Sequence, residues 1–426
     1  MRKAHRLPLN ICDRGTTVKT KRVWLVLAGC MLLYGAMMGI IFNCAGVLIN
    51  GVIQAEGYTS SSVSIFYTLK GLVSTLAMLF TAKLLTRVNI KVMAVLVGLV
   101  GGASFALMSL YTQPWQWAIS GVLNGLASSL VVLLPTTVIR NWFIKNRGTF
   151  MGMYMMLSGV IGAVFNPLAG RLIESVGWRK TSVILGLSAF AMVFIAALLI
   201  VRRPSDVGAL PYGGTEEDVS AEVKSARPAA QHVPFKFKTY LYIFCSVTVA
   251  GLAIQMVSYI PQYASSLGYD PMIGARMTSV LMIGNMSAKL LFGVCSDYVG
   301  LWRSIQLFLG LIGTSMLVLT FGSGVPVLLY IGSLVMGFGY MSGVANSLVS
   351  AEIFDPDQFE IQYSRLSMLS GLSTALSPSI ISYVFDSTGS FKPIFLFLAA
   401  WLFTAVILIS MREKLGIVRK KPEKDA

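Results

Sequence analysis

Charged side chains are scarce in this sequence of 426 residues. They make up 12% of the chain, about half of the share in an ordinary soluble domain, whereas hydrophobic residues make up 55% and the mean hydropathy is +0.72. A water-soluble protein has too little polar surface to cover so much apolar sequence. We therefore expect a membrane protein, and the even distribution of the apolar stretches argues against a soluble domain on a single anchor.

Cysteine and histidine are equally sparse. The five cysteines show no paired or CxxC spacing, which argues against a disulfide framework or a zinc site. The two histidines, His5 and His232, lie in polar segments. With so few histidine and cysteine ligands, the sequence argues against a metal enzyme. The apolar segments also hold no cluster of acid, base and nucleophile. The sequence predicts no metal, no cofactor and no enzymatic activity.

Long apolar segments fill the rest of the chain. They lie at about 23–48, 62–81, 92–111, 115–138, 149–173, 181–201, 239–264, 273–293, 303–322, 325–350, 365–384 and 391–411. Each is near or above the length of about twenty residues that crosses a bilayer as a helix. This predicts an all-α polytopic membrane protein with twelve transmembrane helices. The first segment is long enough to span, so we interpret it as a helix and not as a removed signal peptide.

The second half of the sequence repeats the first. Ser158-Gly159 returns as Ser370-Gly371, and Gly177 returns as Gly389, in each case 212 residues later. Tandem halves of six apolar segments predict two six-helix bundles with a binding site between them, near the bilayer midplane. The expected divisions are residues 1–22 as an N-terminal segment, 23–201 as the first bundle, 202–238 as a linker, 239–411 as the second bundle and 412–426 as a tail.

The distribution of lysine and arginine predicts the orientation. With the N-terminus in the cytoplasm, the cytoplasmic side collects 27 of the 34 basic residues, as the positive-inside rule requires. We expect a multi-pass protein of the cell membrane with both termini cytoplasmic. The net charge of +16 then meets anionic lipid and implies no nucleic acid. The cluster of basic residues at 171–180 is an exception, and the linker 202–238 resembles a flexible cytoplasmic tether.

A short motif follows the eighth apolar segment. The chain reads GVCSDYVGLWR from Gly293 to Arg303, with Asp297 and Gly300 inside it. With six plus six segments and a long central loop, this resembles the GxxxDxxGxxxxR motif of the major facilitator superfamily. The resemblance implies that Asp297 lies by a helix end and a basic residue and helps to latch the two bundles.

The matching stretch of the first half is degraded. It runs from Ala82 to Lys91 and keeps Arg87, but Thr86 replaces the acid and Asn89 replaces the second glycine. The resemblance therefore predicts a latch in the second half and leaves one in the first half open.

Residues 121–179 carry a narrower resemblance. The order NWF, RG, SGxxG, P and GWR is similar to the monocarboxylate transporter and oxalate/formate antiporter branch of the superfamily. In that branch, the position of Lys289 is commonly an arginine that binds the substrate carboxylate. Four residues earlier, proton-coupled members often carry an aspartate, where this chain has Asn285. Asparagine cannot titrate, which leaves three alternatives. Proton coupling uses another group, or transport is exchange or facilitated diffusion, or the substrate anion itself carries the proton stoichiometry.

Lys289 is the sharpest candidate on physical grounds too. It lies about one helical turn from the cytoplasmic end of its segment, where a cation costs several kcal/mol unless it faces a cavity, a partner or the interface. A lysine there would hold an anion; alternatively, its side chain extends to the inner membrane surface. Lys70 lies inside the second segment, either as a further anion contact or in a structural hydrogen bond. Among uncharged groups, we select Tyr34, Tyr259 and Asn346 for the cavity, although such groups also join helices.

The sequence thus predicts a secondary active transporter, a monomer in the bilayer, that moves a small organic anion, a monocarboxylate, by alternating access. Its partners would be that substrate, lipid, and either a coupling proton or a counter-substrate, so both symport and antiport remain open. The alternatives are a drug or metabolite exporter of the same fold and a membrane receptor without flux.

Overall fold

The computed structural model of the chain describes residues 15–58, 63, 65–214, 237–245, 254–354 and 358–411. In this part of the chain the secondary structure is helical, apart from one isolated bridge between Phe143 and Tyr212. Eight of its helices are long and apolar enough to cross a membrane. The all-α polytopic fold is confirmed, and the count of twelve spans stays a prediction.

The first half begins with one long helical segment that changes its geometry in the middle. The helices α1 and α2 are joined by η1, a π-helical stretch that carries two glycines. The helices of this half are α1 (Gly15–Tyr34), η1 (Gly35–Phe42), α2 (Ala45–Glu56), α4 (Ile65–Arg87), α5 (Ile90–Ala106), η2 (Leu107–Leu110), η3 (Pro114–Gln116), α6 (Trp117–Trp142) and α7 (Arg147–Leu199).

The second half has the same type of architecture. A short connection, η4 (Pro204–Val207), precedes it. Its helices are α9 (Phe237–Ile243), η6 (Met256–Tyr259), α11 (Ile260–Ser266), α12 (Pro271–Tyr298), α13 (Leu301–Phe321), α14 (Pro326–Met336), η7 (Gly337–Met341), α15 (Ser342–Ile353), α16 (Phe359–Thr388) and α17 (Lys392–Ser410).

Corresponding glycines of the sequence repeat end corresponding helical segments. Gly177 has φ of +81° and breaks α7 between the fifth and sixth predicted spans, and Gly389 has φ of +66° and ends α16. Such backbone angles favour glycine because it lacks a Cβ. The pairing of helices across the bundles repeats too, since α7 packs on α12 and α16 packs on α4.

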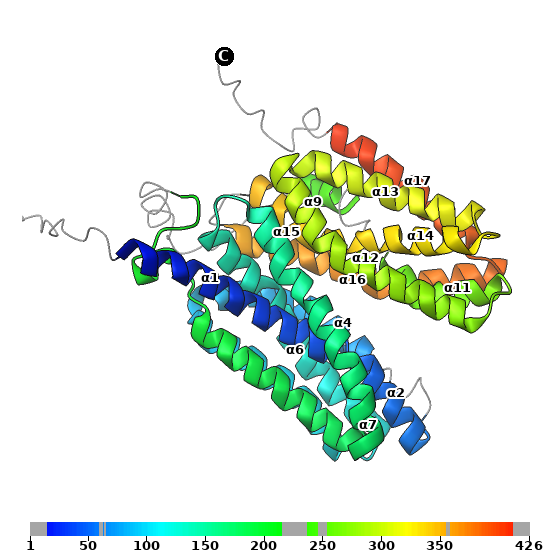
Figure 1. The fold of residues 1–426 in the computed structure, drawn as a ribbon, viewed down its shortest axis with the longest axis horizontal. Coiled ribbons are helices and arrows are strands. Elements are labelled where there is room, and N and C mark those ends of the chain that lie inside the picture. The colour runs from blue at the N-terminus through cyan, green and yellow to red at the C-terminus, as the bar shows by residue number, and fades with distance from the viewer. Residues whose placement is uncertain are drawn as a thin grey trace, which may run out of the picture.

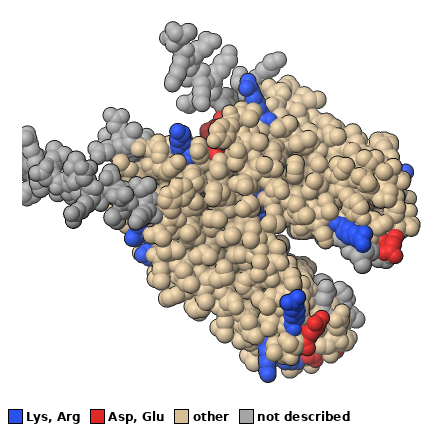
Figure 2. Space-filling model, viewed as in Figure 1, with Lys and Arg blue, Asp and Glu red and all other residues tan. Residues whose placement is uncertain are grey.

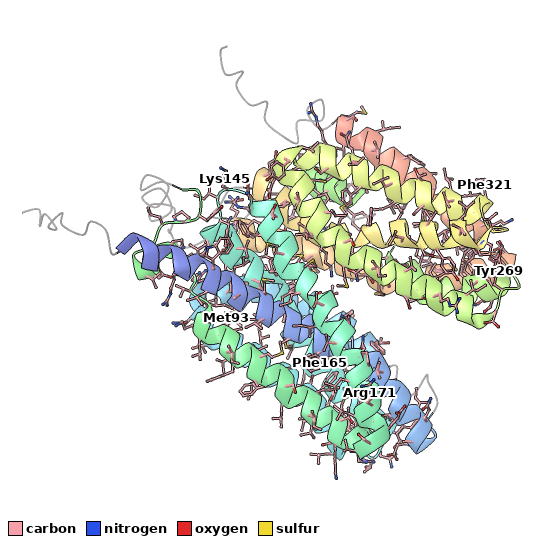
Figure 3. All side chains as sticks on the ribbon, in the orientation of Figure 1. Met93, Lys145, Phe165, Arg171, Tyr269 and Phe321 are labelled. Atoms are coloured by element: carbon pink, nitrogen blue, oxygen red, sulfur yellow. The ribbon has the colours of Figure 1, made fainter. Side chains whose placement is uncertain are left out.

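The two bundles form two lobes that meet at one end and separate at the other (Figure 1). In Figure 3, Lys145 lies at the end where the lobes meet, whereas Arg171 and Tyr269 lie at the opposite, separated ends of the two lobes. The space-filling view shows an open hollow between the lobes at the end where they separate (Figure 2).

The outer surface matches a bilayer. Helix α4 exposes Leu72, Leu76, Phe80 and Leu84, which are spaced four residues apart on one helix face, and Phe80 is 71% exposed. Charged side chains gather toward the ends of the lobes, and the surface between them is largely uncharged (Figure 2). An apolar belt with charged ends is what a lipid-embedded protein requires.

The first part of the linker is ordered against the first bundle. Tyr212 accepts hydrogen bonds from the backbone N–H groups of Ile144 (3.0 Å) and Lys145 (3.3 Å), and its own N–H donates to the Trp142 carbonyl at 2.8 Å. The expected flexible tether is therefore wrong for residues 202–214. Residues 215–236 lie outside the described part of the chain, as do 1–14 and 412–426.

The basic exception at 171–180 also has a structural explanation. The Arg179 guanidinium pairs with the Glu56 carboxylate at 2.9 Å and donates to the carbonyls of Ser109 (3.1 Å) and Tyr111 (2.8 Å). The Trp178 indole N–H donates to the same Glu56 oxygen at 3.1 Å. This turn ties three segments of the first bundle together, so Arg179 serves a local structural purpose at the end of the lobe where the hollow opens.

Candidate anion-binding site between the bundles

Lys289 lies on α12 and reaches across to the other bundle. Its side chain is only 8% exposed, and its Nζ donates a hydrogen bond to the Ser158 hydroxyl of α7 at 3.3 Å. The same Nζ lies 5.5 Å from the centre of the Tyr340 ring of η7. Among the described residues, no carboxylate lies within ion-pair distance of this ammonium. A buried cation with only neutral neighbours favours the arrival of an anion.

Small residues let α12 approach α7 closely enough for this contact. A Cβ added at Gly152 would lie 2.2 Å from the Lys289 carbonyl oxygen, and one added at Gly159 would lie 2.5 Å from the Met286 side chain. Small residues allow such approach wherever helices pack in membranes. The glycines of α7 therefore place the Lys289 ammonium at the interface between the bundles and away from the outer surface.

Ser158 also contacts the end of the π-helical segment. Its hydroxyl donates to the Met155 carbonyl at 2.7 Å, and its carbonyl accepts from the Asn43 amide at 3.3 Å. Asn43 follows η1 directly and is exposed. Ser158 thus connects Lys289 on one side with the end of η1 on the other.

Lys70 reaches the end of η1 from a different helix. Its side chain is 5% exposed, and its Nζ lies 3.7 Å from the centre of the Phe42 ring and 5.9 Å from that of Phe66. No hydrogen-bond partner of this Nζ lies in the described part of the chain. The Phe42 ring is 51% exposed, so it covers a cation that is itself buried.

These contacts join two predicted cations into one arrangement. From Lys289 the contacts run through Ser158 and Asn43 to Phe42, and from there to Lys70. Because Asn43 and Phe42 are consecutive, the end of η1 lies between an ammonium from α12 and one from α4. The sequence identified both lysines as separate candidates and gave no sign of the π-helix that links them.

Asp297 makes a second contact between the bundles, at the start of α7. One carboxylate oxygen accepts from the Gly148 N–H at 2.9 Å, and the other accepts from the Thr149 N–H and hydroxyl at 2.6 Å each. The backbone N–H groups of a first helical turn lack partners within their helix and favour an anion. Gly293 lies beside this contact, since a Cβ there would be 2.2 Å from the Gly148 carbonyl oxygen.

The other motif residues lie at helix ends, and both arginines are exposed. Gly300 precedes α13 with φ of +97°, which explains its glycine, and Arg303 is exposed one turn into that helix. Arg87 is exposed at the end of α4. Among the described residues, neither arginine forms an ion pair.

The remaining candidates are distributed over the structure. Asn285 lies one turn before Lys289 on α12, and the side-chain oxygens of Asn285 and Asn346 are buried without a hydrogen-bond partner among the described residues. Tyr34 packs edge-to-face on Tyr154 at 5.2 Å within the first bundle. Tyr259 packs against Phe391 at 6.2 Å within the second bundle. These ring contacts pack each tyrosine within its own bundle.

Sequence reasoning missed Ser158 and Phe42 as site residues. Ser158 was visible only as half of a repeated Ser-Gly pair, and Phe42 only as one apolar residue in a long apolar segment. The pair of glycines at 35 and 39 was the available signal, because both would clash with α7 if they carried a Cβ.

Comparison with known proteins identifies the class. The family model described as Major Facilitator Superfamily matches residues 27–350 and 277–426. A protein described as an uncharacterized MFS-type transporter, YhjX of Escherichia coli strain K12, is 25% identical over 332 residues, which cover 77% of this chain and 80% of that protein. Monocarboxylate transporter 12 of Rattus norvegicus is 23% identical over 419 residues, covering 90% and 84% of the two chains.

Solved structures agree on the fold. The human organic anion transporter MFSD10 (TETRAN) superimposes with a TM-score of 0.65 at 15% identity, covering 92% of this chain and 99% of that one. The proton:xylose symporter XylE superimposes with a TM-score of 0.69 at 12% identity, covering 94% and 96%. At such identities the similarity establishes the fold and leaves the substrate open.

Proposed function

Because the chain belongs to the major facilitator superfamily of membrane transporters, we propose that it moves a small organic anion, a monocarboxylate, across the cell membrane by alternating access. The observation that carries this proposal is the Lys289 ammonium, which is buried between the bundles beside the Ser158 hydroxyl and the Tyr340 ring. A carboxylate is the ligand that would neutralise it.

The position of Lys289 suggests how binding drives the conformational change. An anion at its Nζ would also lie beside the Ser158 hydroxyl, so a single ligand contacts both bundles. Transport requires that the ligand bind the intermediate, occluded arrangement better than the open ones. A ligand that contacts both bundles meets this requirement, because those contacts are completed only when the bundles close on it.

The structure represents one end of the transport cycle. The bundles are joined at the Asp297 end and separated at the opposite end, where Figure 2 shows the hollow. With both termini in the cytoplasm, as the positive charge predicts, the hollow faces outward. We therefore assign this arrangement to the outward-facing state, in which an external anion reaches Lys289.

The proposed mode of transport follows from Asn285. An amide has no proton to exchange at neutral pH, and it stands one turn before Lys289 on the same helix. We therefore propose exchange of anions or facilitated diffusion, with no proton coupling at this position. A sequence relative described as monocarboxylate transporter 12 supports the anionic substrate.

Counterflow in proteoliposomes tests this function. Vesicles loaded with unlabelled pyruvate or lactate should accumulate the labelled anion, and vesicles loaded with xylose or a lipophilic cation should not. Accumulation driven by lipophilic cations alone would favour a drug exporter of the same fold. Binding of monocarboxylates without any counterflow would favour a receptor. Either result overturns the proposed transport of monocarboxylates.

A further inference from the structure

A cavity of about 360 Å³ lies at the end of the first bundle that holds the turn from α4 into α5, opposite the end where the hollow opens. It is lined by residues of three segments: the start of the first span, the turn from α4 into α5, and the chain after α7. The lining residues are Arg22, Val88, Asn89, Ile90, Lys91, Val201, Arg202, Asp206 and Val207. No part of the transport mechanism above uses them.

The charges around this cavity are unequal. Arg22, Lys91 and Arg202 each come from a different segment, and Asp206 is the one carboxylate in the lining. The Asp206 carboxylate is already engaged, because it accepts the Arg203 backbone N–H at 3.1 Å. Within the lining the three cations therefore exceed the one carboxylate by two charges, and Glu360 outside the lining also acts on Arg202.

The geometry of Arg202 and of the start of α5 adds to this surplus. Arg202 is anchored by a hydrogen bond from its guanidinium to the Leu85 carbonyl at 2.8 Å, which holds this cation in place beside the cavity. Helix α5 begins at Ile90, beside the cavity, with the Asn89 side chain accepting the Lys91 N–H at 2.9 Å. The positive end of a helix dipole thus adds to three cations.

We propose that this cavity binds a phosphoryl anion, namely the phosphate of an anionic phospholipid headgroup in the inner leaflet. The volume admits a phosphate with its glycerol, and the hydrophobic lining residues Val88, Val201 and Val207 suit the first carbons of a lipid. Basic pockets between helices on the cytoplasmic side are the usual lipid-headgroup sites of membrane proteins. A soluble phosphate ester shares the same chemistry and is the second possible source.

Occupation of the cavity would stabilise the first bundle. A phosphate held by Arg22, Lys91 and Arg202 would connect α1, α5 and the linker segment that docks beside α6. The effect should weaken with salt, because the three cations lie near water and the Debye length is about 8 Å at physiological ionic strength.

Native mass spectrometry of the delipidated full chain tests this site. With added phosphatidylglycerol, wild-type protein should retain one lipid more than the double variant Arg22→Gln/Lys91→Gln, and the apparent affinity should fall about fivefold for each cation removed, or about 25-fold for both. Lys145→Gln, an exposed cation at the same end of the molecule, should bind as wild type does. Equal retention by the double variant, or equal loss in Lys145→Gln, would overturn the site.

Melting temperatures distinguish the sources of the phosphate. Phosphatidylglycerol should stabilise wild-type protein more than phosphatidylcholine does, and this difference should vanish in the double variant. Stabilisation by glycerol phosphate or inorganic phosphate at the same concentrations would assign the site to a soluble phosphate instead of a lipid. A double variant that melts at the wild-type temperature without lipid shows that it is folded, and stabilisation by none of these phosphates would refute the proposal.

Discussion

The Asp297 carboxylate of α12 accepts both the backbone N–H and the hydroxyl of Thr149, each at 2.6 Å, at the first turn of α7. These two residues belong to different bundles, so the contact exists only while the bundles are closed at this end. Hydrogen bonds to a charged group contribute about 1.5–3 kcal/mol each. The contact therefore favours one state of the transport cycle over the other.

Asp297→Asn should shift the conformational equilibrium. With the charge removed, we expect a loss of about 1.5–3 kcal/mol in the state that the structure shows, which lowers the equilibrium ratio of this state to the opposite one about tenfold or more. Electron paramagnetic resonance distances between spin labels at the two separated ends, where Arg171 and Tyr269 lie, should shorten. Glu352→Gln is the matched control, because Glu352 accepts from Trp302 within one bundle (3.0 Å); a similar shift in that variant would contradict the assignment.

Gly152→Ala should block closure between α7 and α12. The added Cβ would meet the Lys289 carbonyl oxygen at 2.2 Å, and neither backbone can yield as a flexible side chain would. We expect the transport rate in proteoliposomes to fall at least about tenfold while the protein still folds, since a misplacement of about 1 Å has effects of that order. Gly310→Ala, where no atom lies within 4 Å of the added Cβ, should transport normally. Normal transport by Gly152→Ala would show that this close approach is not needed.

Arg179→Gln should lower the stability of the first bundle without changing substrate preference. The variant loses the ion pair to Glu56 and two hydrogen bonds to carbonyls. We expect a loss of about 1–2 kcal/mol, seen as a lower melting temperature, because each of these exposed contacts contributes little by itself. Arg171→Gln, an exposed arginine on the same helix, should melt as wild type does. A changed order of substrates in Arg179→Gln would instead place this arginine in the transport path.

Lys70→Gln tests whether the second buried cation contributes to anion binding. If the two ammonium groups act on the same anion, the apparent KM should rise on the order of fivefold, the effect of about 1 kcal/mol from a more distant charge. Phe42→Ala, which uncovers this ammonium, should lower the KM. Unchanged kinetics in both variants, with a lowered melting temperature for Lys70→Gln, would assign Lys70 to structure alone.

The fold class and two of the site residues could be predicted from the sequence, for identifiable reasons. Apolar segment length and the 212-residue repeat predicted the fold class, because a bilayer imposes helix length and the two halves are copies. Lys289 and Lys70 were found because a cation is rare in such segments. The glycine at 177 marked a break that its positive φ explains.

Other features required the three-dimensional arrangement. The contact between Lys289 and Ser158 joins residues 131 positions apart, and the covering of Lys70 by Phe42 depends on the π-helical turn of η1. Neither a serine nor a phenylalanine is unusual in an apolar segment. The docking of residues 202–214 was also hidden, because it uses backbone hydrogen bonds that leave no pattern in side chains.

The most direct measurement is the binding of a labelled short monocarboxylate to purified wild-type protein, Lys289→Gln and Lys289→Arg. We predict that the glutamine variant binds about 10- to 100-fold more weakly, the equivalent of about 1.5–3 kcal/mol for a hydrogen bond to a charged group, and that the arginine variant retains binding. Equal affinity of wild-type protein and a folded Lys289→Gln variant would contradict the anion site on which the proposed function rests.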